Sequence, residues 1–293
     1  MNMKKAILID GNSLAYRAYF ATWKQVEYAK QNNLPFNNAI RTMLLMCWNL
    51  IKANVYQYGI VSFDTKAPTF RDQIYEGYKQ KRVKTPVELL VQIPLIKQAL
   101  VYLGFLVCEK DGFEADDLIG SYANLFTKQE ITVDIYSSDR DMLQLVNAFT
   151  NVFLCIKGTK EMVMYNNENF KSLFYGLAPY QVVEYKGLVG DNSDNLAGIK
   201  GIGPIKGIEL LQQYGTIDNI YTNFNNLPNQ LQKLLNNQKE IAKTFSFLAK
   251  IKTDIELDQN IDLTGLKPIQ KQALIQLLSE NKINTLVEKF SKI

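Results

Sequence analysis

The chain has 293 residues, with 33 Lys and Arg against 29 Asp and Glu, three cysteines and no histidine. This length corresponds to one large domain or two domains of ordinary size. The lack of histidine excludes Ser-His-Asp and Cys-His catalysis, imidazole-ligated zinc and haem held by a proximal histidine. The formal net charge of +4 is compatible with a nucleic-acid partner but too mild to indicate one.

The three cysteines, Cys47, Cys108 and Cys155, lie inside apolar runs without C-x-x-C spacing. We expect free buried thiols, which favour a reducing compartment over a disulfide scaffold. The apolar run between Lys5 and Asp10 is too short for the core of a signal peptide, and no apolar stretch is long enough to span a membrane. The sequence therefore predicts a cytoplasmic protein with no membrane partner.

Two hydrophobic periodicities alternate over the first part of the chain. Short apolar runs predict buried strands at 6–10, 59–64, 105–108, 131–139 and 151–156. Helical spacing lies between them, at 39–54, 87–103 and 114–129. This order predicts an α/β domain over residues 1–175, with a mostly parallel sheet flanked by helices. The strand pattern then ends, so we expect a mainly helical region over residues 176–293.

Acidic residues recur where the predicted strands end. They are Asp10, Asp64, Asp139 and Asp141. Any one of them could form a turn or cap a helix. Carboxyl ends of parallel strands meet at one edge of a sheet, where sites form. Their recurrence at equivalent positions therefore favours a functional site.

Two further acidic clusters follow. One contains Glu114, Asp116 and Asp117, and the other contains Asp191 and Asp194. Acids in a first helical turn also complement the helix dipole, but like charges at i,i+3 repel unless a cation lies among them. Nine carboxylates without imidazole or paired thiolates suit Mg²⁺ or Mn²⁺. Two such ions are the usual means of cleaving a phosphodiester.

A basic segment with interleaved tyrosines covers residues 70–84. Its basic residues are Arg71, Lys79, Lys81, Arg82 and Lys84. Positive charge beside aromatic rings is typical of surfaces that bind single strands, although a solvated helix face gives the same pattern.

A glycine-rich motif, GIKGIGPIKG, covers residues 198–207. It predicts a helix-hairpin-helix near residues 187–214, with Ile199 and Ile202 packing the hairpin. Glycines allow close approach of the backbone, and the N–H groups of the next helix can face a phosphate. The motif indicates sequence-independent binding of a DNA duplex.

These motifs resemble the bacterial 5′→3′ exonuclease and flap endonuclease family, including the N-terminal nuclease domain of DNA polymerase I. The segments that carry the resemblance are ILIDGNSLAYRAYF, VSFDTKAPTFR, YEGYKQKR, GFEADDLIG, YSSDRDMLQLV, LVGDNSDNLAGIKGIGPIKG and LVEKF. The resemblance implies a PIN-like (resolvase-like) sheet, a helical arch near residues 70–95 and the helix-3-turn-helix form of the hairpin. Many relatives have histidine after the first Asp-Gly, where Asn12 and Ser13 stand here.

The resemblance also implies roles for individual residues. The first metal ion would be held by Asp10, Asp64, Glu114, Asp116, Asp117 and Asp139, and the second would lie near Asp139, Asp141, Asp191 and Asp194. The arch residues Tyr78, Lys79 and Arg82 would reach the scissile phosphate. Arg17 would contact the substrate, and the hairpin residues Gly198, Lys200, Gly201, Gly203 and Lys206 would bind the duplex, with K⁺ held at the hairpin. From the basic segment, Arg71 and Lys81 are also expected to contact DNA.

The expected function is a structure-specific 5′→3′ exonuclease and flap endonuclease that removes RNA primers and 5′ flaps by a two-metal mechanism. We expect a monomer that binds flap, nicked or branched DNA. A PIN-type ribonuclease would not need the hairpin or the helical region. A catalytically inactive DNA-junction binder would not keep an acid at every ligand position. Met1 favours a free-standing nuclease over a trimmed domain of DNA polymerase I.

Overall fold

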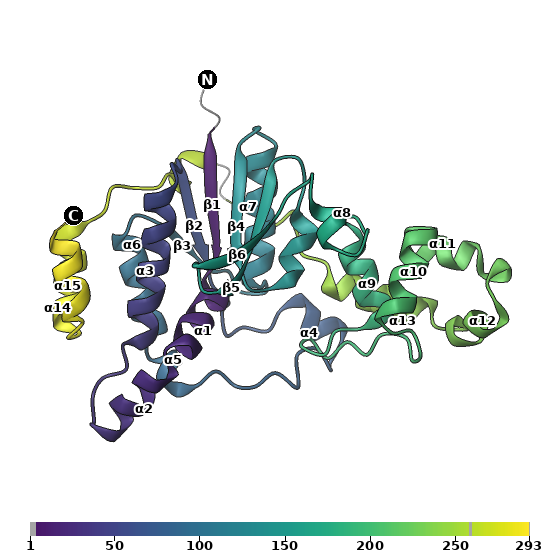
Figure 1. Cartoon of the computed structure of the whole chain (residues 1–293), viewed down its shortest axis with the longest axis horizontal. Helices are drawn as coiled ribbons and strands as arrows, with labels where there is room; N and C mark the ends of the chain where they lie inside the picture. The colour runs from purple at the N-terminus through teal and green to yellow at the C-terminus, as the bar shows by residue number, and fades with distance from the viewer. Residues whose placement is uncertain (1–3, 258–259, 293) are drawn as a thin grey trace.

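A six-stranded sheet forms the centre of the molecule, as the computed structural model of residues 4–257 and 260–292 shows (Figure 1). The strand order is β3-β2-β1-β4-β5-β6. The strands are β1 (Lys5–Asp10), β2 (Tyr58–Ser62), β3 (Leu106–Cys108), β4 (Thr132–Ser137), β5 (Thr150–Lys157) and β6 (Glu161–Tyr165). Neighbouring strands pair in parallel except β5 and β6, which are antiparallel. The mostly parallel sheet is thus confirmed, whereas β6 was not predicted.

Helices cover both faces of this sheet. Those of the first 175 residues are α1 (Gly11–Ala21), α2 (Trp23–Gln31), α3 (Asn38–Ala53), α4 (Phe70–Ile74), α5 (Val87–Leu90), α6 (Ile93–Tyr102), α7 (Ala115–Thr127), the 3₁₀ helix η1 (Arg140–Leu145) and α8 (Phe170–Leu173). Alternate residues of a strand point to opposite faces, so in β1 Ile7 and Ile9 pack with α1, α3 and α6, and Ala6 and Leu8 pack with α7. Burial on both faces explains the uninterrupted apolar runs.

The expected helix over 87–103 is divided in two. Helix α5 ends at Leu90, and α6 begins at Ile93 with Pro94 in its first turn. Proline has no N–H to donate and favours the first turn of a helix over its interior, so it marks a new start rather than a continuation. Helices α1 and α2 were not predicted.

Residues 75–86, here called the strap, connect α4 to α5 below the sheet (Figure 1). The strap contains turns and extended chain and no helix. The predicted helical arch near 70–95 is therefore wrong for this part of the segment. Gly77 and a positive φ of 54° at Lys79 accompany the turn, and Thr85 precedes a proline, a position that disfavours helix.

The helical region follows the sheet. It consists of α9 (Gln181–Val189), α10 (Pro204–Tyr214), α11 (Ile217–Thr222), η2 (Phe224–Asn226), α12 (Asn229–Leu235), α13 (Lys239–Ala249), η3 (Ile261–Thr264), α14 (Lys271–Glu280) and α15 (Asn284–Ser291). A hairpin over 190–203 joins α9 to α10, with Ile199 and Ile202 each 3% exposed, as predicted. Gly198 and Gly201 have positive φ angles of 66° and 89°, which glycine adopts without strain.

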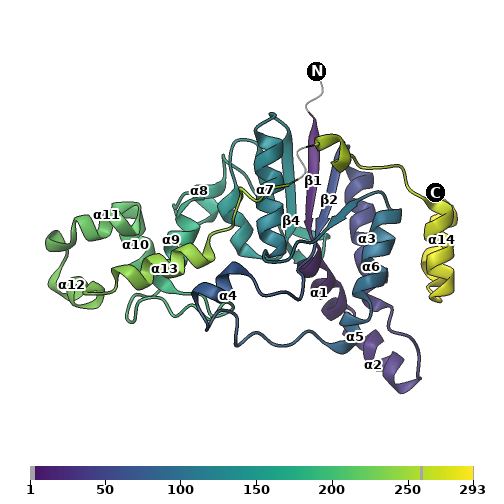
Figure 2. The same cartoon turned by 180° about the vertical axis from the view of Figure 1, so that it is seen from behind.

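The last 40 or so residues return to the α/β domain. Residues 251–253 hydrogen-bond α7 and η1, Gly265 pairs with Tyr58, and α14 and α15 pack beside α3 and α6 (Figures 1 and 2). The sequence had assigned this segment to the helical DNA-binding region, and its packing differs from that expectation. Among the described residues, no helix combines the length and apolar character needed to cross a membrane.

Candidate active site

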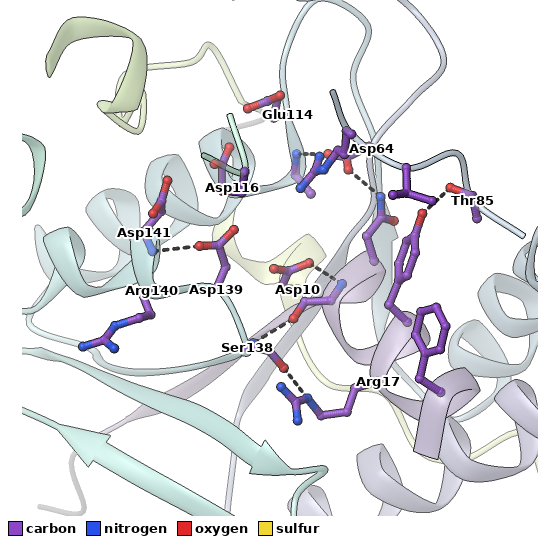
Figure 3. A pocket seen from close by; sticks show the side chains of 18 of the residues that line it. Asp10, Arg17, Asp64, Thr85, Glu114, Asp116, Ser138, Asp139, Arg140 and Asp141 are labelled. Carbon is purple, nitrogen blue, oxygen red and sulfur yellow. Dashed lines mark hydrogen bonds between the residues drawn. The ribbon is translucent and has the colours of Figure 1, made fainter. Parts of the chain in front are cut away.

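A cavity of about 2460 Å³ lies at the carboxyl edge of the sheet. Seven of the nine predicted carboxylates line it: Asp10, Asp64, Glu114, Asp116, Asp139, Asp141 and Asp191. Figure 3 shows six of them converging from the ends of β1, β2 and β4 and from the starts of α7 and η1. The parallel strands bring together acids that are distant in the sequence.

Asp10 and Asp64 are held by the elements that start nearby. Asp10 ends β1 and caps α1, and its carboxylate accepts hydrogen bonds from the Ser13 N–H at 2.9 Å and the Ser137 hydroxyl at 2.7 Å. Burial raises the pKa of Asp10 to about 7. Asp64 accepts a 2.8 Å bond from the Ala115 N–H, which joins the end of β2 to the start of α7.

The start of α7 presents an oxygen without a partner. The Oδ1 atom of Asp116 is buried and has no hydrogen-bond partner. Burial raises the pKa of Asp116, and the charge of Glu114 raises it further. A bound cation would satisfy this oxygen and stabilise the ionised carboxylate. The residues at this place therefore fit a divalent metal ion.

Asp141, Asp191 and Asp194 form a second group, whose ligand atoms lie within 4.8 Å of one another. Burial and the charge of Asp139 raise the pKa of Asp141 to about 7. The ammonium group of Lys186, in α9, contacts Asp141 and Asp191. Burial alone would raise the pKa of Asp191, but the contact with Lys186 lowers it to about 2.

Lys186 was not predicted. It lies five residues before Asp191, within a segment interpreted only as a helix.

A second ammonium group also reaches the carboxylates, since Lys79 Nζ lies 2.6 Å from Glu114 and 3.9 Å from Asp194. Burial alone would lower the pKa of Lys79, but the charges of Glu114 and Asp194 raise it. Lys79 is therefore held in its charged form.

Arg71 does not reach a surface where it could contact DNA. It is 1% exposed, its guanidinium forms two 2.7 Å bonds to Asp117, and it also donates to the carbonyls of Leu248 and Lys250. The prediction of a DNA contact is wrong because a buried guanidinium needs these acceptors.

Asp117 was predicted to be a ligand of the first metal ion, but its carboxylate is buried and fully hydrogen-bonded. Both its oxygens accept hydrogen bonds from Arg71 and from backbone N–H groups, and it is absent from the cavity lining. Tyr78 is also buried, with its hydroxyl donating to Glu114 at 3.1 Å. In this structure Asp117 and Tyr78 support Arg71 and Glu114 and do not face the cavity.

The other predicted contacts divide between the cavity and the surface. Lys79 and Arg82 line the cavity, as does Arg17, which donates to the Ser138 hydroxyl at 2.7 Å. Lys81 is exposed outside the cavity lining. The hairpin residues Gly198, Lys200, Gly201, Gly203 and Lys206 also lie outside it, and all but Gly198 are exposed.

Family comparisons match both parts of the chain. Residues 5–175 match the 5′-3′ exonuclease N-terminal resolvase-like domain, and residues 177–272 match the 5′-3′ exonuclease C-terminal SAM fold. A 5′-3′ exonuclease of Mycoplasma pneumoniae is 68% identical over 99% of this chain and 100% of its own length. A 5′-3′ exonuclease of Aquifex aeolicus is 35% identical over 99% of this chain and 96% of its own length. DNA polymerase I of Bacillus subtilis is 31% identical over 99% of this chain but only 32% of its own length.

Solved structures share the fold. A T5 5′-exonuclease with bound zinc ions aligns with a TM-score of 0.70 at 18% identity, over 95% of this chain and 100% of that chain. The catalytic core of Rad2 in complex with a DNA substrate aligns with a TM-score of 0.61 at 15% identity, over 95% of this chain and 87% of that chain. Fold and carboxylate site together define a nuclease with a resolvase-like domain and a helical domain. The chain belongs to the 5′-3′ exonuclease family and is a hydrolase.

Proposed function

We propose that this exonuclease cleaves flap, nicked and branched DNA from the 5′ side, and so removes RNA primers and 5′ flaps in replication and repair. The observation that carries the proposal is the group of carboxylates around the unpartnered Asp116 oxygen, at the carboxyl edge of a parallel sheet. A cytoplasmic location and a monomeric state belong to the same proposal.

Two Mg²⁺ or Mn²⁺ ions would fit the carboxylates of the cavity together with Asp194, which lies beside Asp141 and Asp191 but outside the cavity lining. Asp10, Asp64, Glu114, Asp116 and Asp139 would hold the first ion, and Asp139, Asp141, Asp191 and Asp194 would surround the second. Divalent ions at such a site supply a hydroxide nucleophile at neutral pH and offset charge on the leaving oxygen. The orphaned Asp116 oxygen and the oxygen-only donor set support this assignment.

The protein's own cations would bind and orient the phosphate. Lys79 stays protonated between Glu114 and Asp194, so it would act as a fixed positive charge and not as a base. Arg82, exposed at the cavity, would add a second positive group that can reach a phosphate oxygen. Positive groups fixed near developing negative charge lower the barrier to phosphoryl transfer.

The hairpin after α9 would bind the duplex part of the substrate. Exposed Gly201 and Gly203 allow a DNA backbone to approach closely, and exposed Lys200 and Lys206 would contact phosphates. K⁺ at the hairpin would be held by its main-chain carbonyls. Arg17 and Lys81 would add contacts nearer the cleaved strand.

The test is cleavage of a 5′-labelled flap substrate, with DNA and RNA 5′ segments, in Mg²⁺ and in EDTA. We expect cleavage that EDTA abolishes and that the double variant Asp116→Ala, Asp139→Ala lacks. Asp218→Ala is a matched control, because Asp218 is an exposed acid of α11 outside the cavity. Cleavage that survives EDTA, or that the double variant retains, contradicts the two-metal proposal.

The role of Lys79 is tested by comparing the cleavage rates of two lysine-to-alanine variants. We expect Lys79→Ala to lower the cleavage rate by about 100-fold, the loss typical of one electrostatic group in an active site. Lys128→Ala, at an exposed lysine at the end of α7 outside the cavity lining, should change the rate much less. Equal rates for the two variants would overturn the assignment.

A further inference from the structure

The strap is joined to the loop that carries the second acidic group. This loop, residues 191–196, is closed by backbone hydrogen bonds of 2.7 and 2.8 Å between Asp191 and Leu196. Three hydrogen bonds connect it to the strap: the Lys79 N–H donates to the Asp194 carbonyl at 3.1 Å, the Asn195 side-chain amide donates to the Gly77 carbonyl at 2.7 Å, and the Tyr78 hydroxyl donates to the Asp194 carboxylate at 3.5 Å. A turn of the strap is thus fixed to the acidic loop on both sides of Tyr78.

Asn195 has the backbone conformation that this contact needs. Its φ is 57°, in the left-handed region that asparagine adopts more readily than most residues. Tyr78 packs nearby in a small apolar cluster with Leu196 and Phe245. Beside this cluster, the side chain of Asn195 adds a polar contact to the Gly77 carbonyl of the strap.

Lys79 depends on this support. Its own φ of 54° is unfavourable for lysine, and such a conformation persists only when surrounding contacts impose it. The contacts that impose it include the Asp194 carbonyl, the carboxylates that its ammonium group reaches, and the Asn195–Gly77 bond two residues earlier. The buried Tyr78 adds hydrogen bonds to Glu114 and Asp194. Without that bond, the turn that directs the Lys79 ammonium group into the cavity would open more often.

We propose that Asn195 is a positioning residue that holds the strap turn against the acidic loop and thereby places Lys79 in the active site. The proposal rests on the proposed function for the role of Lys79, but the strap contact itself is independent of nuclease activity. Asn195 touches neither the carboxylates of the cavity nor, by this proposal, the substrate.

Trypsin tests the contact directly, because the strap contains Lys79, Lys81, Arg82 and Lys84. Asn195→Gly keeps the left-handed conformation and removes the donor, and Asn195→Asp replaces the donating amide with an acceptor. In EDTA and without DNA, we expect both variants to speed cleavage within residues 79–84 by about three- to tenfold, the ratio that corresponds to one net hydrogen bond. Cleavage sites elsewhere should be unaffected, as mass spectrometry of the fragments would show.

Asn237→Gly is the matched control. Asn237 also has a positive φ of 58°, and it lies in an exposed turn between α12 and α13. Strap cleavage at the wild-type rate in both Asn195 variants, or equal acceleration in Asn237→Gly, would overturn the proposal.

A double-mutant cycle tests whether Asn195 acts through Lys79. In single-turnover flap cleavage, Asn195→Gly should lower the rate severalfold with little change in DNA affinity. The same substitution in a Lys79→Ala background should have almost no further effect, since coupled residues are not additive. Additive losses would contradict positioning through Lys79. If no variant and no wild-type protein cleaves DNA, the proposed function fails while the trypsin result still decides the strap contact.

Discussion

Two neighbouring carboxylates at the start of α7 have opposite effects on the fold. Asp117 is fully buried and neutralises the guanidinium of Arg71, whereas the Oδ1 atom of Asp116 is buried without a partner. Removing one member of a buried ion pair leaves an uncompensated charge, whereas neutralising a buried carboxylate that has an unpartnered oxygen removes a desolvation cost.

We therefore expect Asp117→Asn to destabilise the protein by about 3–5 kcal/mol, the cost of breaking a buried pair. In EDTA at pH 8, Asp116→Asn should leave the free energy of unfolding unchanged or raise it, because burial disfavours the charged form of Asp116. Urea denaturation of both variants measures the contrast. A loss of stability in Asp116→Asn as large as that in Asp117→Asn would contradict it.

Proton release should accompany metal binding. Asp10 and Asp141 have pKa values raised to about 7 by burial, so both are largely protonated at pH 6 without metal. Metal ligands must be deprotonated, so Mg²⁺ binding at pH 6 should release protons, and affinity should rise with pH until it levels off above about 7. Calorimetry at pH 6 in buffers of different ionisation enthalpy measures the release. A binding enthalpy independent of the buffer would disprove it.

The sequence predicted some site residues better than others for a physical reason. Asp10, Asp64 and Asp139 follow strands whose parallel order is readable from local periodicity, so their meeting at one edge could be inferred. Arg71 could not be assigned, because its carbonyl acceptors at Leu248 and Lys250 are distant in the chain. Charge pattern alone does not distinguish a buried guanidinium from an exposed one.

The hairpin between α9 and α10 depends on glycine at one position and not at another. Gly198 has a φ of 66°, and an added Cβ would lie 2.4 Å from the carbonyl carbon of Val189. Gly203 caps α10 with a φ of −89°, and an added Cβ would meet no atom within 4 Å. Gly198 is therefore required by the fold of the hairpin, whereas the fold does not require glycine at position 203, where the lack of a side chain leaves room for DNA to approach.

We expect Gly198→Ala to cost about 2 kcal/mol or more, from backbone strain and the clash with Val189. Gly203→Ala should cost about 1 kcal/mol or less, the usual penalty for alanine at a helix N-cap. If the hairpin binds duplex DNA, Gly203→Ala should still weaken that binding, which fluorescence anisotropy measures. Equal stability losses would show that the hairpin geometry is not the cause.

The strap shows where local patterns do not determine an element. Its charges and tyrosines suit a helix face, but the chain has only the five-residue helix α4 before it becomes extended. Short helices are marginal without an apolar face to pack. The strap is held instead by single contacts of Tyr78, Lys79 and Gly77 to distant residues, which local periodicity does not reveal.

At the scale of the whole molecule, the C-terminal segment packs against the sheet domain formed by the first part of the chain. The C-terminal segment leaves the helical region, passes along α7 and ends against α3 and α6 (Figure 2). The expected helical character is confirmed for α14 and α15, whereas residues 251–257 and 265–270 contain no helix. Helical spacing also does not tell which surface a helix covers. The segment therefore stabilises the sheet domain without lining the cavity.

Phe290 provides the test of this arrangement. It is fully buried, and its ring makes an edge contact with Trp48 of α3 at a centroid distance of 5.8 Å. Phe290→Ala should lower the free energy of unfolding by about 3–5 kcal/mol through lost burial and a residual cavity. Leu263→Ala, at a side chain that is 51% exposed, should change it by about 0.5 kcal/mol or less. Because neither residue lines the cavity, the cleavage rate per folded molecule at 25 °C should be unchanged in both variants. Urea denaturation combined with single-turnover cleavage measures both quantities, and a loss of rate without a loss of stability would show that the C-terminal helices act on the site itself.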